Sequence, residues 1–247
     1  MRGAARGGPG IQSLHHAWTL PPELARTLTR VGSLVALVVA LSPPLQGAAH
    51  RYAVFETVQY CLLAVVVPAL AVLGAPWRLL GLSPLLERLD AGRARRRTIQ
   101  RAAVELAPAL AVLVAWRTPA LVDRLQQHPF LLALEAVTLV PAGALIWLDC
   151  VASPPAVPRL SPLGRLPVAA VSMWTLWILA YIVGMATSDS YPAFAHVGGR
   201  SLSTAADLQL TAGVMWVVAA AAFLPILFSN LMAWLRSDHG GWPASLK

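Results

Sequence analysis

Four acidic residues stand inside long apolar segments of this 247-residue chain: Glu56, Glu105, Glu135 and Asp149. An ionised side chain near the centre of a bilayer costs about 2.5–3.5 kcal/mol on insertion scales, so each acid calls for a partner or a function. Glu56 and Glu135 fall near the outer ends of their segments, and the other two fall near the inner ends. The chemistry open to such carboxylates is ion pairing, uptake of a proton, or metal binding through oxygen.

Further polar residues lie at the same outer depth as Glu56 and Glu135. Glu56, Gln59 and Tyr60 are spaced i, i+3 and i+4, which places all three on one face of a helix. The sequence therefore predicts a buried polar cluster beneath the outer surface, made of Glu56, Gln59, Tyr60, Arg117, Glu135 and Asp207. Two interpretations stay open: a network that fixes helix packing, or a functional site or its remnant.

An ion pair is the specific contact that we predict inside this cluster. An unpaired carboxylate at this depth would be expensive or would take up a proton, whereas an arginine can extend its long stem and donate to one or two carboxylates. We expect Arg117 to reach Glu56, Glu135 or both. The competing hypothesis is an oxygen-ligand metal site formed by Glu56, Glu135 and Asp207, with Arg117 turned away.

No motif in the chain proposes an enzyme. The sequence has no glycine-rich phosphate loop, nucleophile elbow, CxxC pair or HExxH motif. Its 6 histidines do not pair at the helical spacing of a metal site. The arginines cluster without the interleaved aromatic residues that single-stranded nucleic acid requires, so nucleic acid is not an expected partner.

The elements that position these residues are membrane helices. Apolar residues make up 57% of the chain and charged residues only 12%, against about 25% in soluble domains. Helices satisfy their backbone groups within each span, and about 20 apolar residues cross the hydrocarbon core. We therefore predict an all-α bundle of about six transmembrane helices over 28–236, with spans near 28–45, 52–73, 100–116, 130–151, 165–186 and 208–235.

The distribution of basic residues predicts the orientation of the bundle. Only Arg51, Arg117, Arg124 and Arg200 of the 19 Lys and Arg residues fall on one side of these spans, so the side with the other fifteen is cytoplasmic. Both tails, 1–27 and 237–247, are then cytoplasmic. The arginine-rich segment Leu85–Arg101 is expected to bind anionic lipid headgroups, which attract such clusters by about 1 kcal/mol per charge.

A series of short strings runs in order along most of the chain: Leu41–Pro43, Phe55–Tyr60, Val67–Ala69, Val72–Pro76, Trp116–Leu121, His128–Pro129, Leu134–Glu135, Arg159–Leu163, Tyr191–Phe194 and the spaced set Asp207, Leu210, Met215 and Trp216. Taken together, these strings resemble the CtaG family of bacterial cytochrome c oxidase assembly factors. The resemblance implies a polytopic protein of the bacterial plasma membrane that helps to mature a haem–copper oxidase. It also implies a link to copper supply and contact with oxidase subunits.

The chain departs from the family pattern at the outer-leaflet histidines. Where the pattern has His-x-x-Gln-His this chain has Glu56, Gln59 and Tyr60, and Arg117 and Ala136 replace two further histidines. Copper binding through imidazole is therefore not carried over. The function that we predict is a non-enzymatic accessory role in cytochrome c oxidase assembly. The alternatives are a degenerate structural partner that handles no metal, and a small-molecule or metal transporter, although no inverted pair of broken helices is evident.

Overall fold

The structure, a computed structural model, describes residues 21–78, 81, 83–84, 99–128, 130–154, 160–187, 190–195 and 201–239. These residues form helices, with no strand element among them. The first half contains α2 (Pro22–Ala40), α3 (Pro43–Ala49), α4 (Ala53–Cys61), the π-helix η2 (Leu62–Val66), α5 (Val67–Gly74) and the short 3₁₀ helix η3 (Pro76–Arg78). The second half contains α7 (Ile99–Trp116), α8 (Pro119–Gln127), α9 (Leu131–Cys150), α10 (Pro162–Gly184), α11 (Pro192–Ala195) and α12 (Thr204–His239).

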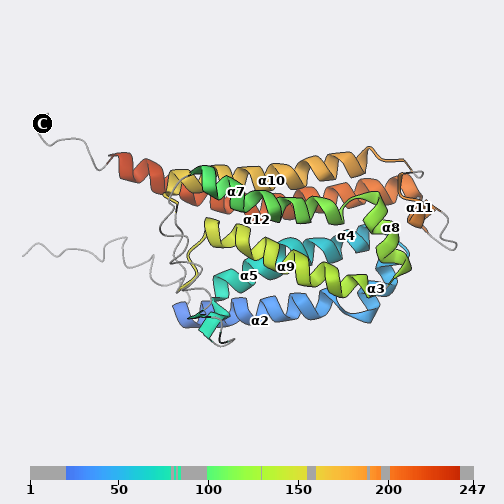
Figure 1. Ribbon diagram of the computed structural model, residues 1–247, viewed down its shortest axis with the longest axis horizontal. Helices are drawn as coiled ribbons and strands as arrows, with labels where there is room; N and C mark the ends of the chain where they lie inside the picture. Colours follow the sequence, from blue (N-terminus) through green and yellow to red (C-terminus); the bar gives the residue numbers. More distant parts are fainter. Residues whose placement is uncertain are drawn as a thin grey trace, which may run out of the picture.

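The long helices pack side by side as one bundle (Figure 1). Four stretches are long and apolar enough to cross a membrane as continuous helices: Ala53–Gly74, Leu131–Cys150, Pro162–Gly184 and Thr204–Arg236. Counting each of two bent helix pairs as one span brings the number of candidate spans among the described residues to 6. The expected all-α membrane bundle is thereby confirmed. Its outer surface carries aliphatic side chains such as Val104, which is 71% exposed and suited to lipid.

The first bent pair is α2 and α3, which meet at 52°. Pro43 and Pro44 have no backbone N–H, so the carbonyls of Val39 and Ala40 lose their usual helical donors. The Ser42 hydroxyl donates to the Val39 carbonyl over 2.8 Å instead. The first span, predicted at 28–45, is therefore a helix that begins at Pro22 and ends at Ala40, followed by a second short helix.

The second bent pair is α7 and α8, which meet at 60°. Pro119 starts α8, and the preceding Thr118 has the extended backbone (φ −70°, ψ 139°) that a following proline favours. The helix therefore breaks directly after Trp116. Arg117 lies in this break, where its side chain is carried into the bundle.

A further proline distorts the candidate span Ala53–Gly74, which has the largest buried share of the four continuous ones. Pro68 cannot donate to the carbonyl of Ala64, and the backbone passes through the π-turn of η2 just before it. Gly143 of α9 packs against this point. A Cβ at Gly143 would overlap the Ala64 carbonyl oxygen and would lie 2.6 Å from the Pro68 ring. The absence of a side chain there allows α9 to approach the distorted helix closely.

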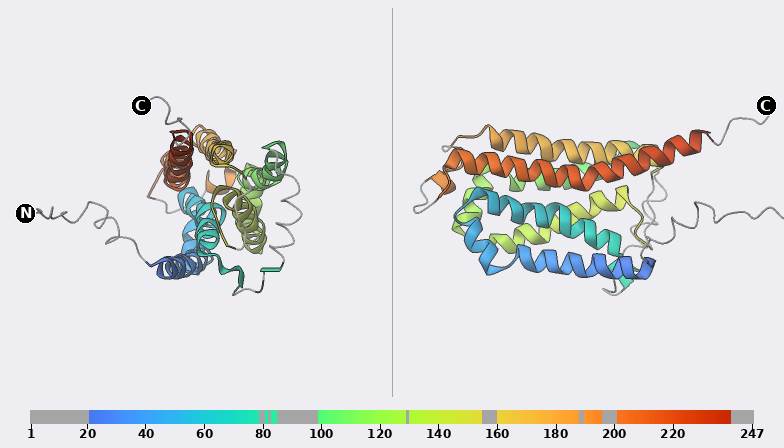
Figure 2. Two further views of the ribbon diagram at one scale, coloured as in Figure 1. Left: turned by 90° about the vertical axis from the view of Figure 1, so that its left-hand side faces the viewer. Right: turned by 180° about the vertical axis from the view of Figure 1, so that it is seen from behind.

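The two ends of the bundle differ in character (Figures 1 and 2). The start of α2 and the end of α12 lie at one end, and α3, α8 and α11 lie together at the other, which we call the loop end.

The predicted headgroup-binding segment Leu85–Arg101 lies outside the residues whose side chains are described, as does the side chain of Glu105. The predicted tails, 1–27 and 237–247, are also largely outside, although α2 already begins at Pro22.

Candidate functional site at the loop end

The predicted ion pair is present at the loop end, one turn below the surface. Arg117 Nη1 donates to Glu56 Oε2 over 2.5 Å, and both side chains are 2% exposed. Glu56 is the fourth residue of α4, while Arg117 enters from the break between α7 and α8. The prediction that Arg117 reaches Glu56 is therefore confirmed, and Arg117 is not turned away from the acids.

Arg117 makes two further contacts with α4. Its Nη2 donates to the Thr57 hydroxyl over 2.9 Å, and its guanidinium carbon lies 5.0 Å from the centre of the Tyr60 ring. A cation at this distance over an aromatic face is attracted by the ring. One helical face thus binds the guanidinium through an acid, a hydroxyl and an aromatic ring. Thr57 was missed in the sequence because it stands beside the polar stripe and resembles an ordinary core threonine.

The helix break also frees two backbone carbonyls, and two tyrosines bond to them. The Tyr60 hydroxyl donates to the Leu113 carbonyl over 2.9 Å, and the Tyr191 hydroxyl donates to the Arg117 carbonyl over 3.2 Å. Burial raises the pKa of Tyr191 above its usual value, so this hydroxyl keeps its proton and remains a donor. Tyr191 was not among the predicted site residues. Pro119 marks the helix break in the sequence, but not the direction of the 60° bend that brings the Arg117 carbonyl to Tyr191.

Glu135 lies in the same cluster but without a bonded partner. It is the fifth residue of α9 and is 1% exposed. Neither of its carboxyl oxygens has a hydrogen-bond partner among the described residues, and the same holds for Glu56 Oε1 and Arg117 Nε. Glu56 and Arg117 both interact electrostatically with Glu135. The site therefore holds two carboxyl groups near one guanidinium, and only one of them is bonded to it.

Gln59 and Asp207, which we also predicted in the cluster, stabilise helix ends instead. Gln59 Nε2 donates to the Ala40 carbonyl over 2.5 Å and so replaces the donor that Pro44 lacks. The Asp207 carboxylate accepts from the backbone N–H groups of Ala53 and Val54 over 2.8 and 3.0 Å. An acid at this position caps the amino end of α4 and interacts favourably with its dipole.

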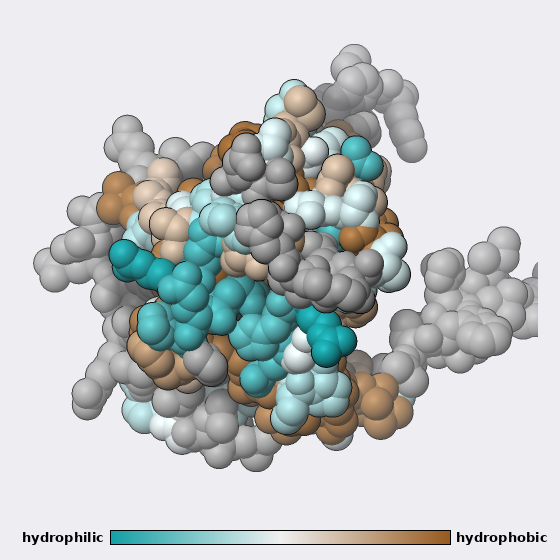
Figure 3. All heavy atoms as spheres, turned by 90° about the vertical axis from the view of Figure 1, so that its right-hand side faces the viewer, coloured by the Kyte–Doolittle hydropathy of each residue, from teal (hydrophilic) through white to brown (hydrophobic). Residues whose placement is uncertain are grey.

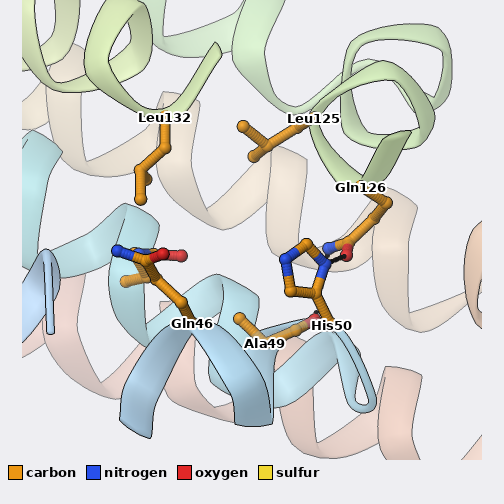
Figure 4. A pocket seen from close by; sticks show the side chains of 7 residues that line it. Gln46, Ala49, His50, Leu125, Gln126 and Leu132 are labelled. Carbon is orange, nitrogen blue, oxygen red and sulfur yellow. Dashed lines mark hydrogen bonds between the residues drawn. The ribbon is translucent and has the colours of Figure 1, made fainter. Parts of the chain in front are cut away.

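A small hollow opens beside the cluster at the loop end. Figure 3 shows that hydrophilic residues gather in the middle of this end of the molecule. The hollow has a volume of about 20 Å³, room for about one water molecule, and is lined by Gln46, Ala49, His50, Gln59, Leu125, Gln126 and Leu132 (Figure 4). His50 Nδ1 and Gln126 Oε1 lie 2.6 Å apart at its side.

The donor atoms of the cluster do not suit copper. Cu(I) prefers thiolate, thioether and imidazole ligands, whereas this cluster offers two carboxyl groups, a phenol and a hydroxyl beside a guanidinium cation. The Arg117 guanidinium already bonds to Glu56 Oε2, and its positive charge repels a metal cation. The part of the chain that the structure describes contains no group of three or more His, Cys, Asp or Glu side chains placed to hold a metal ion.

Comparison with known proteins agrees with the resemblance found in the sequence strings. The model of the family described as cytochrome c oxidase caa3 assembly factor (Caa3_CtaG) matches residues 10–237. This range contains all six predicted site residues. No curated protein and no solved structure matches the chain.

Proposed function

The chain belongs to the cytochrome c oxidase caa3 assembly factor family, and from this membership we propose that it is a membrane accessory factor in the assembly of a caa3-type oxidase. We further propose that it acts without catalysis and through contact with oxidase subunits, not by presenting copper at the loop-end cluster. The observation that carries the second proposal is the Arg117–Glu56 pair, in which a cation already occupies the buried acid. The pair holds α4 against the α7–α8 break, so we assign the cluster a structural role in packing the helices of the bundle.

The packing around the cluster favours this function over transport. A transporter would need polar groups that continue through the bilayer centre. Inward from the acids on the same two stretches of helix, leucines follow: Leu139 lies one turn after Glu135, and Leu63 lies two turns after Glu56. Both leucines are fully buried. Along α4–η2 and α9, the polar side chains of the cluster are therefore followed inward by buried leucines.

The setting of the chain is also part of the proposal. The fifteen-to-four distribution of basic residues would put both ends of the chain on the cytoplasmic side of a bacterial plasma membrane, with the loop end outside. The predicted partner of Leu85–Arg101 is then the anionic headgroup layer on the cytoplasmic side.

The test is a deletion strain complemented by variants. Deletion is expected to lower the amount of assembled haem–copper oxidase, measured from the haem absorption of membranes, while another respiratory complex keeps its activity. Wild-type protein and the Glu56→Gln/Arg117→Gln double variant, which keeps the shape of the pair without its charges, should both restore the oxidase. Normal oxidase in the deletion strain would overturn the assembly role. Stoichiometric copper in purified wild-type protein, lost in the double variant, would overturn the copper-free mode of action.

A further inference from the structure

The charges at the loop-end cluster do not balance if every acid is ionised. Arg117 supplies one positive charge and bonds to Glu56, which leaves the Glu135 carboxyl as a second acid in the same buried space. Tyr60 also interacts electrostatically with Glu135, and its hydroxyl is bonded to a backbone carbonyl. An ionised Glu135 would therefore be a buried carboxylate that no described side chain donates to.

The other elements packed against α9 supply no cation to Glu135 among the residues whose side chains are described. η2 and α5 carry no charged residue, and α7 carries none between Leu106 and Trp116. On α10, Arg165 interacts with Cys150, which is at the opposite end of α9. On α8, Asp123 accepts a hydrogen bond from the backbone of α11, and Arg124 is exposed.

Burying an ionised carboxylate without hydrogen bonds is far more costly than burying a neutral carboxylic acid, and a neighbouring carboxylate increases the difference. Both conditions hold for Glu135, beside Glu56 and with two unbonded oxygens. We propose that Glu135 is a proton-binding site, a neutral carboxylic acid at neutral pH that exchanges its proton with water through the hollow at the loop end. This assignment goes beyond the assembly role and does not depend on it.

The position of the hollow supports the exchange route. Its lining includes Leu132, which is three residues before Glu135 on α9, and Gln59, which is three residues after Glu56 on α4. Residues three apart on a helix are neighbours on its surface, so the hollow lies within one turn of both acids. His50 and three glutamine side chains offer the two to four hydrogen bonds that a confined water needs. A proton bound by Glu135 is taken from water at this opening and returned to it.

Infrared spectroscopy of the purified full-length protein tests the assignment. At neutral pH the wild-type protein and Glu23→Gln, a control at an exposed acid, should both show the C=O band of a protonated carboxyl group. Glu135→Gln should lack this band and should keep the wild-type melting temperature, because glutamine resembles the neutral acid in shape. In deuterated water the band should shift. Leu132→Phe, which fills the hollow, should slow that shift at least tenfold without removing the band.

Two results would overturn the proposal. One is a wild-type spectrum at neutral pH with no protonated carboxyl band, or a band that Glu135→Gln retains. The other is deuterium exchange at the wild-type rate in Leu132→Phe, which would show that the proton does not reach Glu135 through the hollow. If Glu135→Gln fails to fold, ¹³C-labelled glutamate in the wild-type protein serves instead: a band that does not move on labelling arises from another residue type and contradicts the assignment.

Discussion

Removing the Arg117 side chain should cost far more stability than removing an exposed arginine with the same kind of bond. In Arg117→Ala the Glu56 carboxylate loses the guanidinium that donates to it over 2.5 Å, and it stays buried at 2% side-chain exposure. Breaking a buried pair in this way costs about 3–5 kcal/mol, because one charge is left without compensation. The lost contact with the Tyr60 ring adds about 0.5–2 kcal/mol.

The chain contains a matched control for this variant. Arg26 donates to Glu23 over 2.9 Å, but their side chains are 40% and 78% exposed. Exposed pairs contribute only about 0–1 kcal/mol, so Arg26→Ala should change the free energy of unfolding by no more than that. The Glu56→Gln/Arg117→Gln double variant removes both charges together. It should be less destabilised than Arg117→Ala, since no unpaired charge remains.

The measurement is the free energy of unfolding in mixed micelles, titrated with a denaturing detergent and followed by the loss of helical circular dichroism. A double-mutant cycle over Glu56→Gln and Arg117→Gln isolates the coupling of the pair. The reasoning is refuted if Arg117→Ala loses no more stability than Arg26→Ala. It is equally refuted if the double variant is as unstable as Arg117→Ala, because the cost would then lie in lost packing and not in the uncompensated charge.

Four other predictions use the same unfolding assay or a labelling assay. Gly143→Ala should cost about 1–3 kcal/mol, since its Cβ would overlap atoms of η2 and α5, whereas Gly213→Ala, with nothing within 4 Å, should be neutral or stabilising. Asp207→Ala should cost about 0.5–2 kcal/mol and speed amide hydrogen exchange at the start of α4, and unchanged exchange there would contradict its capping role. Gln59→Leu should cost about 1–3 kcal/mol because it leaves the Ala40 carbonyl without its side-chain donor, and no loss would mean that this bond is dispensable. Gly92→Cys should resist an impermeant thiol reagent in intact cells, and its modification would reverse the predicted orientation.

The membrane architecture could be predicted from the sequence because its signal is long and repeated. Runs of apolar residues mark the helices, and α7 and α9 begin and end within one residue of the predicted spans 100–116 and 130–151. The first span was less accurate. Pro43 and Pro44 were recognised as an interruption, but apolar residues continue past them, so hydropathy alone extended the span beyond Ala40.

The ion pair of the candidate site could be predicted because a buried arginine has one suitable type of partner, an acid. Arg117 is the one fully buried cation among the described residues, it was expected near acids at one depth, and the cost of an unpaired charge required a pair. Helical spacing grouped Gln59 with Glu56, yet spacing does not tell which carbonyl a neighbouring helix presents. Asp207 caps α4 only because α12 starts beside it, and that adjacency is a property of the packed bundle.

The broken helices and the polar cluster have a common cause. Proline breaks at the loop end free the carbonyls of Ala40 and, near the α7–α8 bend, of Leu113 and Arg117, and buried carbonyls must find donors. Gln59, Tyr60 and Tyr191 supply those donors, so three polar side chains are explained by the backbone alone. Arg117 and Glu56 need no backbone partner to explain them, because each side chain compensates the charge of the other. Glu135 is the remaining acid: no described backbone group or cation bonds to it, so a structural role gives no reason for a glutamate there, and proton binding does.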